Sequence, residues 1–415
     1  IIKGGRSSNI NIVDNFGIII SGNSTSAITT AGLGNNNINI DSNLIYRCLH
    51  GIYSVGTSGS ENNRIKITYN KIGEGYAGGE EVGARGIYMA FSSTTTNPSL
   101  IEKNNIQIGV NTTTGFSLDC SGIWVGDGNA GLAIFKNNIH DIINNTSSAY
   151  FVSGIYMLGI ANTNVEIANN MIRDVISARK TTTIIGGKAN FGICCIGIGS
   201  IKISNNTIGL ITPNSQGSVT GALSAAVYLD TPMTLNEFSN NILVNKNNST
   251  AAFCHLSRAT VNGGSVLEKN SYYYPNGSMG YYSSATYSTL ESWQLFHGKD
   301  QSSFIENPPF VSATDVHIQN GKITQLESNS LTSTYVKDID NDDRPGPTGS
   351  TYGGATSKDI GADEFDGIAY IAPSLLSVIQ TPDTQNCTGT PRTVGVLFNT
   401  LGNALDSVML EYSIN

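Results

Sequence analysis

The chain has 415 residues, a formal net charge of −8 and only 13% charged residues. An acidic balance argues against nucleic acid or an anionic membrane as the main partner, because both repel negative charge. No run of about 18 apolar residues occurs, so the sequence predicts no membrane span.

A short phrase centred on an asparagine recurs through the first 270 residues. An apolar residue stands three positions before the Asn and usually another stands two positions after it, as in Ile67-Thr-Tyr-Asn70-Lys-Ile72. The recurring residues are Asn15, Asn43, Asn70, Asn104, Asn137, Asn170, Asn206, Asn241 and Asn270. Successive Asn residues stand 27 to 36 positions apart. Repeats of this length are typical of solenoid proteins, in which each repeat forms one coil.

The residues before each Asn predict strands. Apolar, mostly β-branched residues alternate there, as in Ile65/Ile67 and Val165/Ile167, which indicates a strand with one buried face. Helical repeats would need Ala, Leu, Glu and Lys at 3.6-residue spacing, and such runs are absent. We therefore predict an all-β fold in which residues 1–271 form the coils of a right-handed parallel β-helix.

The recurring Asn is expected to occupy a corner of each coil. Asn tolerates the left-handed backbone conformation that sharp corners need. Equivalent corners of successive coils lie about 4.8 Å apart, so stacked side-chain amides can form a hydrogen-bonded ladder. We interpret the nine Asn residues as structural.

A second pattern repeats in another part of each coil, as in Gly51-Ile-Tyr53 and Gly154-Ile-Tyr156. If the Ile points into the core, the following aromatic residue points outward. The aromatic residues of this pattern are Tyr53, Tyr88, Trp124, Tyr156 and Tyr228. Stacked coils would present them as a platform for sugar rings or for a partner surface. Alternatively, the insertions at 73–85 and 110–120 cover the rings, which then only pack.

Residues 272–367 differ in composition from the coil repeats, with many aromatic residues and prolines. They are predicted to cap the open end of the coils. Three segments stand out there: Trp293 with Gly298-Lys-Asp300, then Asn307-Pro-Pro-Phe-Val311, and finally Asp338-Ile-Asp340 with Arg344-Pro345 and Asp359-Ile-Gly-Ala-Asp-Glu-Phe365. This trio resembles the closing segments of secreted parallel β-helix repeat proteins of the Bacteroidetes. The resemblance covers residues 1 to about 367.

The resemblance implies a large secreted or cell-surface protein, because many members leave the cell by the type IX secretion system. It implies the secretion machinery, further domains of the same polypeptide, and glycans or other surface ligands as partners. The family includes both adhesins and polysaccharide-degrading enzymes. Residues 368–415 fit this picture: they alternate like the first strands of an immunoglobulin-like or fibronectin-type sandwich and are too few to complete one. The chain therefore looks like a slice of a longer polypeptide.

Catalytic signals are sparse. Arg64-Ile-Lys66 matches one motif of the polygalacturonases, but the other motifs are missing and the coil carboxylates, among them Asp141 and Asp174, look scattered instead of aligned by repeat. Glycoside hydrolysis needs a pair of carboxyl groups. We predict a non-catalytic protein used in adhesion or as a rigid spacer. The alternative is a carbohydrate-active enzyme, either a polysaccharide lyase or a pectin-type hydrolase.

One segment resembles a metal loop, and no other cofactor is predicted. Asp338, Asp340 and Asp342 have the spacing of the first ligands of a calcium loop, but Asp343 replaces the required Gly and Gly349 replaces the required Glu, which excludes an EF-hand. A structural calcium site remains one interpretation, and a capping loop in which Arg344 pairs with nearby carboxylates is the other. The six Cys residues form no disulfide framework, and most are expected to be small buried hydrophobes.

Overall fold

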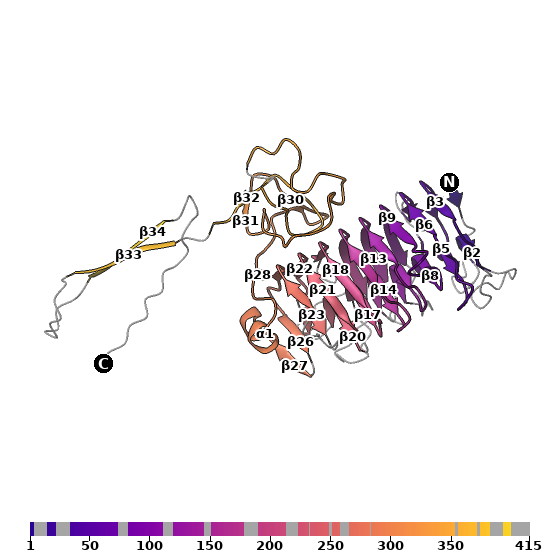
Figure 1. Ribbon diagram of the computed structural model, residues 1–415, viewed down its shortest axis with the longest axis horizontal. Coiled ribbons are helices and arrows are strands. Elements are labelled where there is room, and N and C mark those ends of the chain that lie inside the picture. The colour runs from indigo at the N-terminus through magenta and orange to yellow at the C-terminus, as the bar shows by residue number, and fades with distance from the viewer. Residues whose placement is uncertain are drawn as a thin grey trace.

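The computed structural model of the protein describes residues 1–3, 15–21, 34–73, 82–110, 119–144, 151–177, 190–212, 223–231, 233–248, 251–257, 265–282, 284–352, 356–371, 374–381 and 393–399. Its strands stack into a parallel β-solenoid with three long sheets (Figure 1). This confirms the predicted all-β parallel solenoid. Among the described residues, no helix is long and apolar enough to cross a membrane.

Each coil contributes one strand to each sheet, in the order C, A, B along the chain. Sheet C contains β3 (Asn39–Asp41), β6 (Lys66–Thr68), β9 (Leu100–Glu102), β12 (Ala133–Phe135), β15 (Val165–Ala168), β18 (Ile201–Ser204), β21 (Leu235–Ser239) and β24 (Val266–Glu268). Sheet A contains β1 (Ile2–Lys3), β4 (Leu44–Tyr46), β7 (Lys71–Ile72), β10 (Asn105–Val110), β13 (Asn138–Asn144), β16 (Met171–Ser177), β19 (Thr207–Leu210), β22 (Ile242–Asn245), β25 (Ser271–Tyr273) and β28 (Phe304–Ile305). Sheet B contains β2 (Phe16–Ile20), β5 (His50–Val55), β8 (Arg85–Ala90), β11 (Cys120–Val125), β14 (Val152–Leu158), β17 (Asn190–Ile196), β20 (Ser224–Asp230), β23 (Ala252–Ser257), β26 (Ser278–Tyr282) and β27 (Ala285–Tyr287).

The interior is a column of stacked β-branched side chains. Ile134 pairs in register with Ile167, which pairs with Ile203, and all three are fully buried. The repeated Gly of sheet B is needed because the coil is narrow there: a Cβ on Gly154 would lie 2.4 Å from Cγ2 of Ile172 and 2.7 Å from the carbonyl oxygen of Gly192. The Gly-Ile-aromatic pattern therefore marks where the backbone passes close to the opposite side of the core.

The corner between sheets C and A is built differently from the prediction in one respect. The residue in the left-handed conformation is the one before the ladder Asn, with φ near +55° in every coil. These corner residues are Ser42, Tyr69, Lys103, Lys136, Asn169, Asn205, Asn240 and Lys269. The ladder Asn follows with its side chain turned inward, because its amide is required for hydrogen bonding inside the coil.

The C-terminal end of the solenoid is closed by helix α1 (Leu290–His297). Thr289 caps the helix in a capping box with Ser292, and Gly298 ends it at φ +61°. Leu290 and Trp293 are buried against the core of the last coils. Of the predicted cap, residues 272–305 thus complete and close the solenoid.

Residues 306–369, which we call the side module, do not close the end, so the prediction that all of 272–367 forms an end cap is wrong. The module contains β29 (Phe310–Ser312), β30 (Asp315–Ile318), β31 (Ile323–Thr324) and β32 (Ile368–Ala369). It lies beside the solenoid near β22 (Figure 1). Apolar side chains on the outer face of sheet A hold it there: Ile242 and Val244 pack with Ile318, Leu326, Ile360 and Phe365.

The remaining described strands are β33 (Ser374–Thr381) and β34 (Thr393–Asn399), which pair antiparallel. Residues 407–412, predicted as a further strand, and Cys387 lie outside the described residues. The five described Cys residues are all buried, as predicted for most of the six. Burial raises the pKa of the Cys120 and Cys254 thiols to about 12, which makes these thiols unreactive at neutral pH.

A buried histidine makes this end of the solenoid sensitive to acid. His255 on β23 lies between the rings of Phe238 and Trp293, at centroid distances of 4.6 and 5.1 Å, and neither ring nitrogen has a hydrogen-bond partner. Burial, reinforced by the nearby His297, lowers the pKa of His255 to about 3.

Stability should therefore fall with falling pH. The unfolded histidine titrates near 6.5, so the stability contribution of neutral His255 is complete above that pH and is lost as the pH approaches 3. The expected loss is about 1.4 kcal/mol per pH unit within this window. Thermal melts at pH 6 and pH 5 should show a smaller loss for His255→Phe than for the wild type. Equal losses in the two proteins would contradict this assignment.

Candidate functional site

The Asn ladder is formed by eight of the nine predicted residues. From Asn43 to Asn241, each residue donates its backbone N–H and its side-chain amide to Oδ1 of the Asn in the next coil. The ladder ends at Asn270, whose amide donates to buried Asp300. The prediction is wrong for Asn15, which precedes β2 of sheet B and whose carbonyl oxygen accepts from the N–H groups of Leu49 and His50.

A ladder of this kind should be sensitive to loss of an internal member. In Asn170→Ala, the buried backbone N–H of Asn137 loses its acceptor and the carbonyl oxygens of Ile134 and Ala168 lose a donor. We expect a loss of about 1–3 kcal/mol. Asn43→Ala is the matched control, because Asn43 is half-buried at the first rung and its side chain donates only to Asn70 and to its own strand. Chemical denaturation of both variants measures the difference, and similar midpoints would contradict the ladder's energetic role.

A second Asn ladder, not predicted from the sequence, lies where the chain leaves sheet B. Asn35 donates its backbone N–H to Oδ1 of Asn62, and Asn129 donates likewise to Asn162, at 2.9 and 2.8 Å. Each of these residues stands eight positions before a member of the first ladder, for example Asn162 before Asn170. This constant offset was the available signal. Both ladders are structural.

The predicted aromatic platform is not a binding surface. The rings do stack in register along sheet B, with centroids 4.4 Å apart for Tyr53 and Tyr88 and 4.3 Å apart for Trp124 and Tyr156. However, Tyr53, Trp124, Tyr156 and Tyr228 are between 2 and 9% exposed, and only Tyr88 is half-buried. Trp124, Tyr156 and Tyr228, with Tyr88 packed against them, form a second apolar layer together with Phe151, Phe191, Leu223 and Phe253. Most of insertions 73–85 and 110–120, predicted as the alternative cover, lies outside the described residues.

The coil carboxylates Asp141 and Asp174 are aligned, contrary to the prediction. Each follows a ladder Asn by four residues, and each interrupts its strand with a positive φ, +51° and +52°. The pairs His140–Arg173 and Ile142–Val175 flank them in register on β13 and β16. Arg173 contacts both carboxylates, at 3.2 Å from Asp141 and 2.8 Å from Asp174. Sequence reasoning missed this pair because a bulge, and not the strand phase, sets its position.

Asp141 is held as a charged group. Burial alone would raise the pKa of Asp141, but the hydrogen bond from His140 and the Arg173 guanidinium together lower it. His140 also contacts Asn105, 2.9 Å from its Nε2. An ionised carboxylate held by a guanidinium can bind a cationic or hydroxyl group, but it cannot act as a proton donor at neutral pH.

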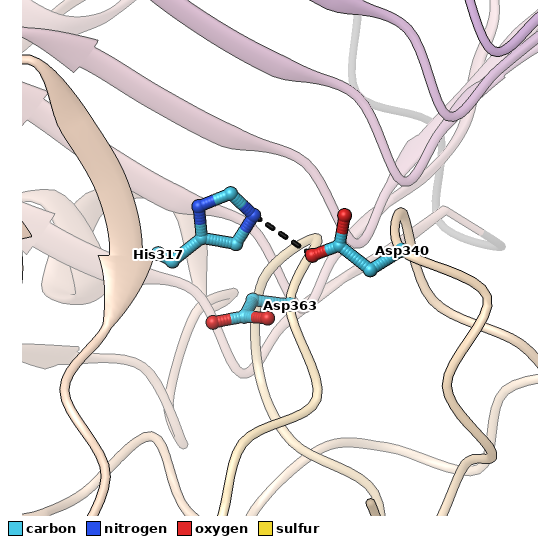
Figure 2. Close-up of side chains that lie close together, drawn as sticks. All are labelled: His317, Asp340 and Asp363. Carbon is cyan, nitrogen blue, oxygen red and sulfur yellow. Dashed lines mark ion pairs between the residues drawn. The ribbon is translucent and has the colours of Figure 1, made fainter.

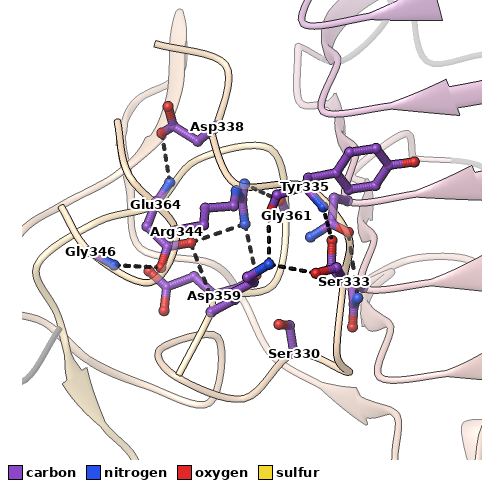
Figure 3. Close-up of polar contacts among 12 residues, drawn as sticks. Ser330, Ser333, Tyr335, Asp338, Arg344, Gly346, Asp359, Gly361 and Glu364 are labelled. Atoms are coloured by element: carbon purple, nitrogen blue, oxygen red, sulfur yellow. Dashed lines mark hydrogen bonds and ion pairs between the residues drawn. The ribbon is translucent and has the colours of Figure 1, made fainter. Parts of the chain in front are cut away.

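The shape of the side module depends on Arg344, as one of the two sequence interpretations proposed (Figure 3). The Arg344 side chain is fully buried, forms an ion pair with buried Glu364 at 3.1 Å, and donates to the carbonyl oxygens of Asp359 and Gly361. Burial raises the pKa of Glu364 to about 7, although Arg344 opposes the shift.

The calcium loop predicted at Asp338, Asp340 and Asp342 is not formed. Asp338 is buried, and its two carboxylate oxygens accept the backbone N–H groups of Asp342 and Glu364. Asp342 is exposed, and Asp340 turns instead toward His317. The three carboxylates therefore do not converge on one point. Asp338 holds the loop through backbone hydrogen bonds, Asp340 faces His317, and Asp342 faces solvent.

Asp340 belongs to another cluster, with His317 and Asp363 (Figure 2). One potential ligand atom of each residue lies within 4.8 Å of the others, the only such group of three in the part of the chain that the structure describes. His317 Nδ1 lies 2.5 Å from Asp315, and its Nε2 lies 2.9 Å from Asp340. The Asp340 carboxylate beside Nε2 raises the pKa of His317 to about 10, with burial opposing the shift, and burial raises the pKa of Asp363 to about 6.

Comparisons with known proteins add no family to this description. The sequence matches no protein-family model, and it matches neither a curated protein nor a solved structure.

Proposed function

We propose that the chain is a non-catalytic, rigid β-solenoid of a larger secreted or cell-surface protein, in which it acts as a spacer between other domains. The observation that carries this proposal is the unbroken ladder from Asn43 to Asn270, which joins each of these coils to the next through side-chain hydrogen bonds, all buried except the half-buried first one. Buried hydrogen bonds between coils resist bending, because opening one coil leaves polar groups unsatisfied. The partners we propose are further domains of the same polypeptide and the secretion machinery.

Rigidity can be measured directly. Asn39 and Val266 are exposed on β3 and β24, the first and last strands of sheet C. The eight strands of this sheet leave seven steps of about 4.8 Å, or about 34 Å in total. Spin labels on Asn39→Cys and Val266→Cys, in a Cys387→Ser background, should give one narrow distance distribution near that length. A broad or bimodal distribution would contradict a rigid spacer.

The alternative of a carbohydrate-active enzyme rests on the aligned pair Asp141 and Asp174. Against it, a glycosidase needs one carboxyl group that keeps its proton near neutral pH, and the pKa of Asp141 is lowered. We expect the full chain to release neither reducing ends nor unsaturated products from pectin, alginate or chondroitin-type polymers. Turnover that Asp141→Asn or Asp174→Asn abolishes, while Asp342→Asn retains it, would establish the enzyme instead.

A further inference from the structure

The cluster of His317, Asp340 and Asp363 joins three separate segments of the side module. His317 lies on β30, Asp340 lies in the loop after Tyr335, and Asp363 lies in the turn that carries Glu364. The segment with Asp340 also touches the solenoid, because the neighbouring Asn341 accepts a hydrogen bond from Lys103 at 2.9 Å. A bond among these three side chains would therefore fix both the module and its contact with the coils.

The geometry of His317 differs from that of a simple ion pair. Its Nε2 lies 2.9 Å from Oδ2 of Asp340, yet this buried nitrogen forms no hydrogen bond, so the N–H direction does not point at the oxygen. Ligands around a metal ion show this relation, because their lone pairs point at the ion and not at each other. With metal–ligand distances of about 2.1 Å, neighbouring ligand atoms in a tetrahedral site lie about 3.4 Å apart.

The surroundings orient these side chains as metal ligands are oriented. His317 Nδ1 lies 2.5 Å from Oδ1 of Asp315, the arrangement in which a carboxylate holds the second nitrogen of a metal-binding imidazole. Oδ2 of Asp363 accepts the backbone N–H of Ile318 at 2.8 Å. Asp363 is thus fixed by the same strand that carries His317.

We propose that His317, Asp340 and Asp363 bind one zinc ion, with Asp315 as the positioning residue for His317. Imidazole nitrogen with carboxylate oxygen is a donor set that suits zinc, whereas calcium takes oxygen ligands only. Ligand atoms of a tetrahedral zinc ion lie about 3.4 Å apart, so the cluster, whose potential ligand atoms lie within 4.8 Å of one another, has to contract by up to about 1.4 Å around the ion. Zinc would cross-link three segments of the side module. This stabilising role is separate from the spacer role proposed above.

The test uses the full chain, stripped with a chelator and titrated with zinc by calorimetry, with bound metal counted by mass spectrometry. The wild type should bind one zinc ion per chain and melt at a higher temperature with zinc than without it. Because the Asp340 side chain is 56% exposed, Asp340→Asn should fold normally and bind zinc at least tenfold more weakly. Asp315→Asn should weaken binding about 10–100-fold.

Asp342→Asn is the matched control, because it removes the same charge from the same loop at an exposed side chain outside the cluster. It should bind zinc like the wild type. The proposal is overturned if the wild type binds no zinc, if Asp340→Asn binds as tightly as the wild type, or if calcium binds in preference to zinc.

Discussion

Replacing Arg344 with methionine should destabilise the side module by about 3–5 kcal/mol. The guanidinium is the cation that faces buried Glu364, and it also satisfies the carbonyl oxygens of Asp359 and Gly361. Removing the guanidinium leaves the buried carboxylate without a cation. It also leaves two carbonyl oxygens without the hydrogen-bond donor that they have in the wild type. Hydrogen exchange of the amides in residues 338–364 should become faster, while the coils remain protected.

The defect of Arg344→Met should depend on pH. Glu364 already titrates near 7, above its unfolded value of 4.5, so its neutral form is the one that the buried site tolerates without a cation. The variant should therefore be less defective at pH 5 than at pH 8, and Arg344→Met combined with Glu364→Gln should recover part of the loss.

The control is Lys337→Met, which removes the exposed pair between Lys337 and Asp343. Exposed pairs of this kind often contribute nothing measurable, so module exchange should not change. If Arg344→Met behaved like Lys337→Met, the buried network would not hold the module.

Trp124→Ala should lower stability by about 3–5 kcal/mol, although sequence reasoning cast Trp124 as a binding residue. Its ring packs on Tyr156 and Phe151, with centroid distances of 4.3 and 5.7 Å, and the Arg85 guanidinium lies 3.9 Å from its centroid. The truncation would open a cavity in the second apolar layer and remove the closer of the two aromatic contacts of Arg85, which leaves only the contact with Tyr88 at 5.0 Å.

The matched control is Tyr69→Ala, since Tyr69 is 54% exposed at the corner of its coil. Removing it should change stability by less than about 0.5 kcal/mol. Because coils contact mainly their neighbours, the effect of Trp124→Ala should appear first in the exchange rates of β8, β11 and β14. Normal stability together with lost binding to a glycan array would restore the recognition role.

The repeated parts of the molecule were predictable because the same sequence pattern recurs from coil to coil. The Asn phrase gives both the period and the corner, and the alternation around Ile67 or Ile167 identifies the buried strand face. The direction of Trp124 was also predicted, since it points away from the Ile column. Its burial was only the alternative interpretation, because side chains of other segments, such as Phe151, cover it, and strand alternation carries no information about that second layer.

The side module was predictable only in part. The pairing of Arg344 with a carboxylate follows from a lone buried cation in an acidic segment, but His317 and Asp363 are brought together by a docking arrangement that no local pattern encodes. The prediction that Asp141 and Asp174 are scattered was wrong for another reason. Their common offset from Asn137 and Asn170 was visible, but the bulge that turns both toward Arg173 was not.

The corner residues that precede the ladder Asn determine where along the repetitive solenoid the side module docks. Between Lys103 and Lys269 these residues are Lys136 and then Asn169, Asn205 and Asn240, and the three Asn are buried. At the module's two margins Lys103 donates to Asn341 and Lys269 donates to Asn329. Identical coils would let a docked module slip by one repeat, and two lysines a fixed number of coils apart prevent this. Whole-coil duplication should therefore be tolerated before Lys103 and rejected between the two lysines.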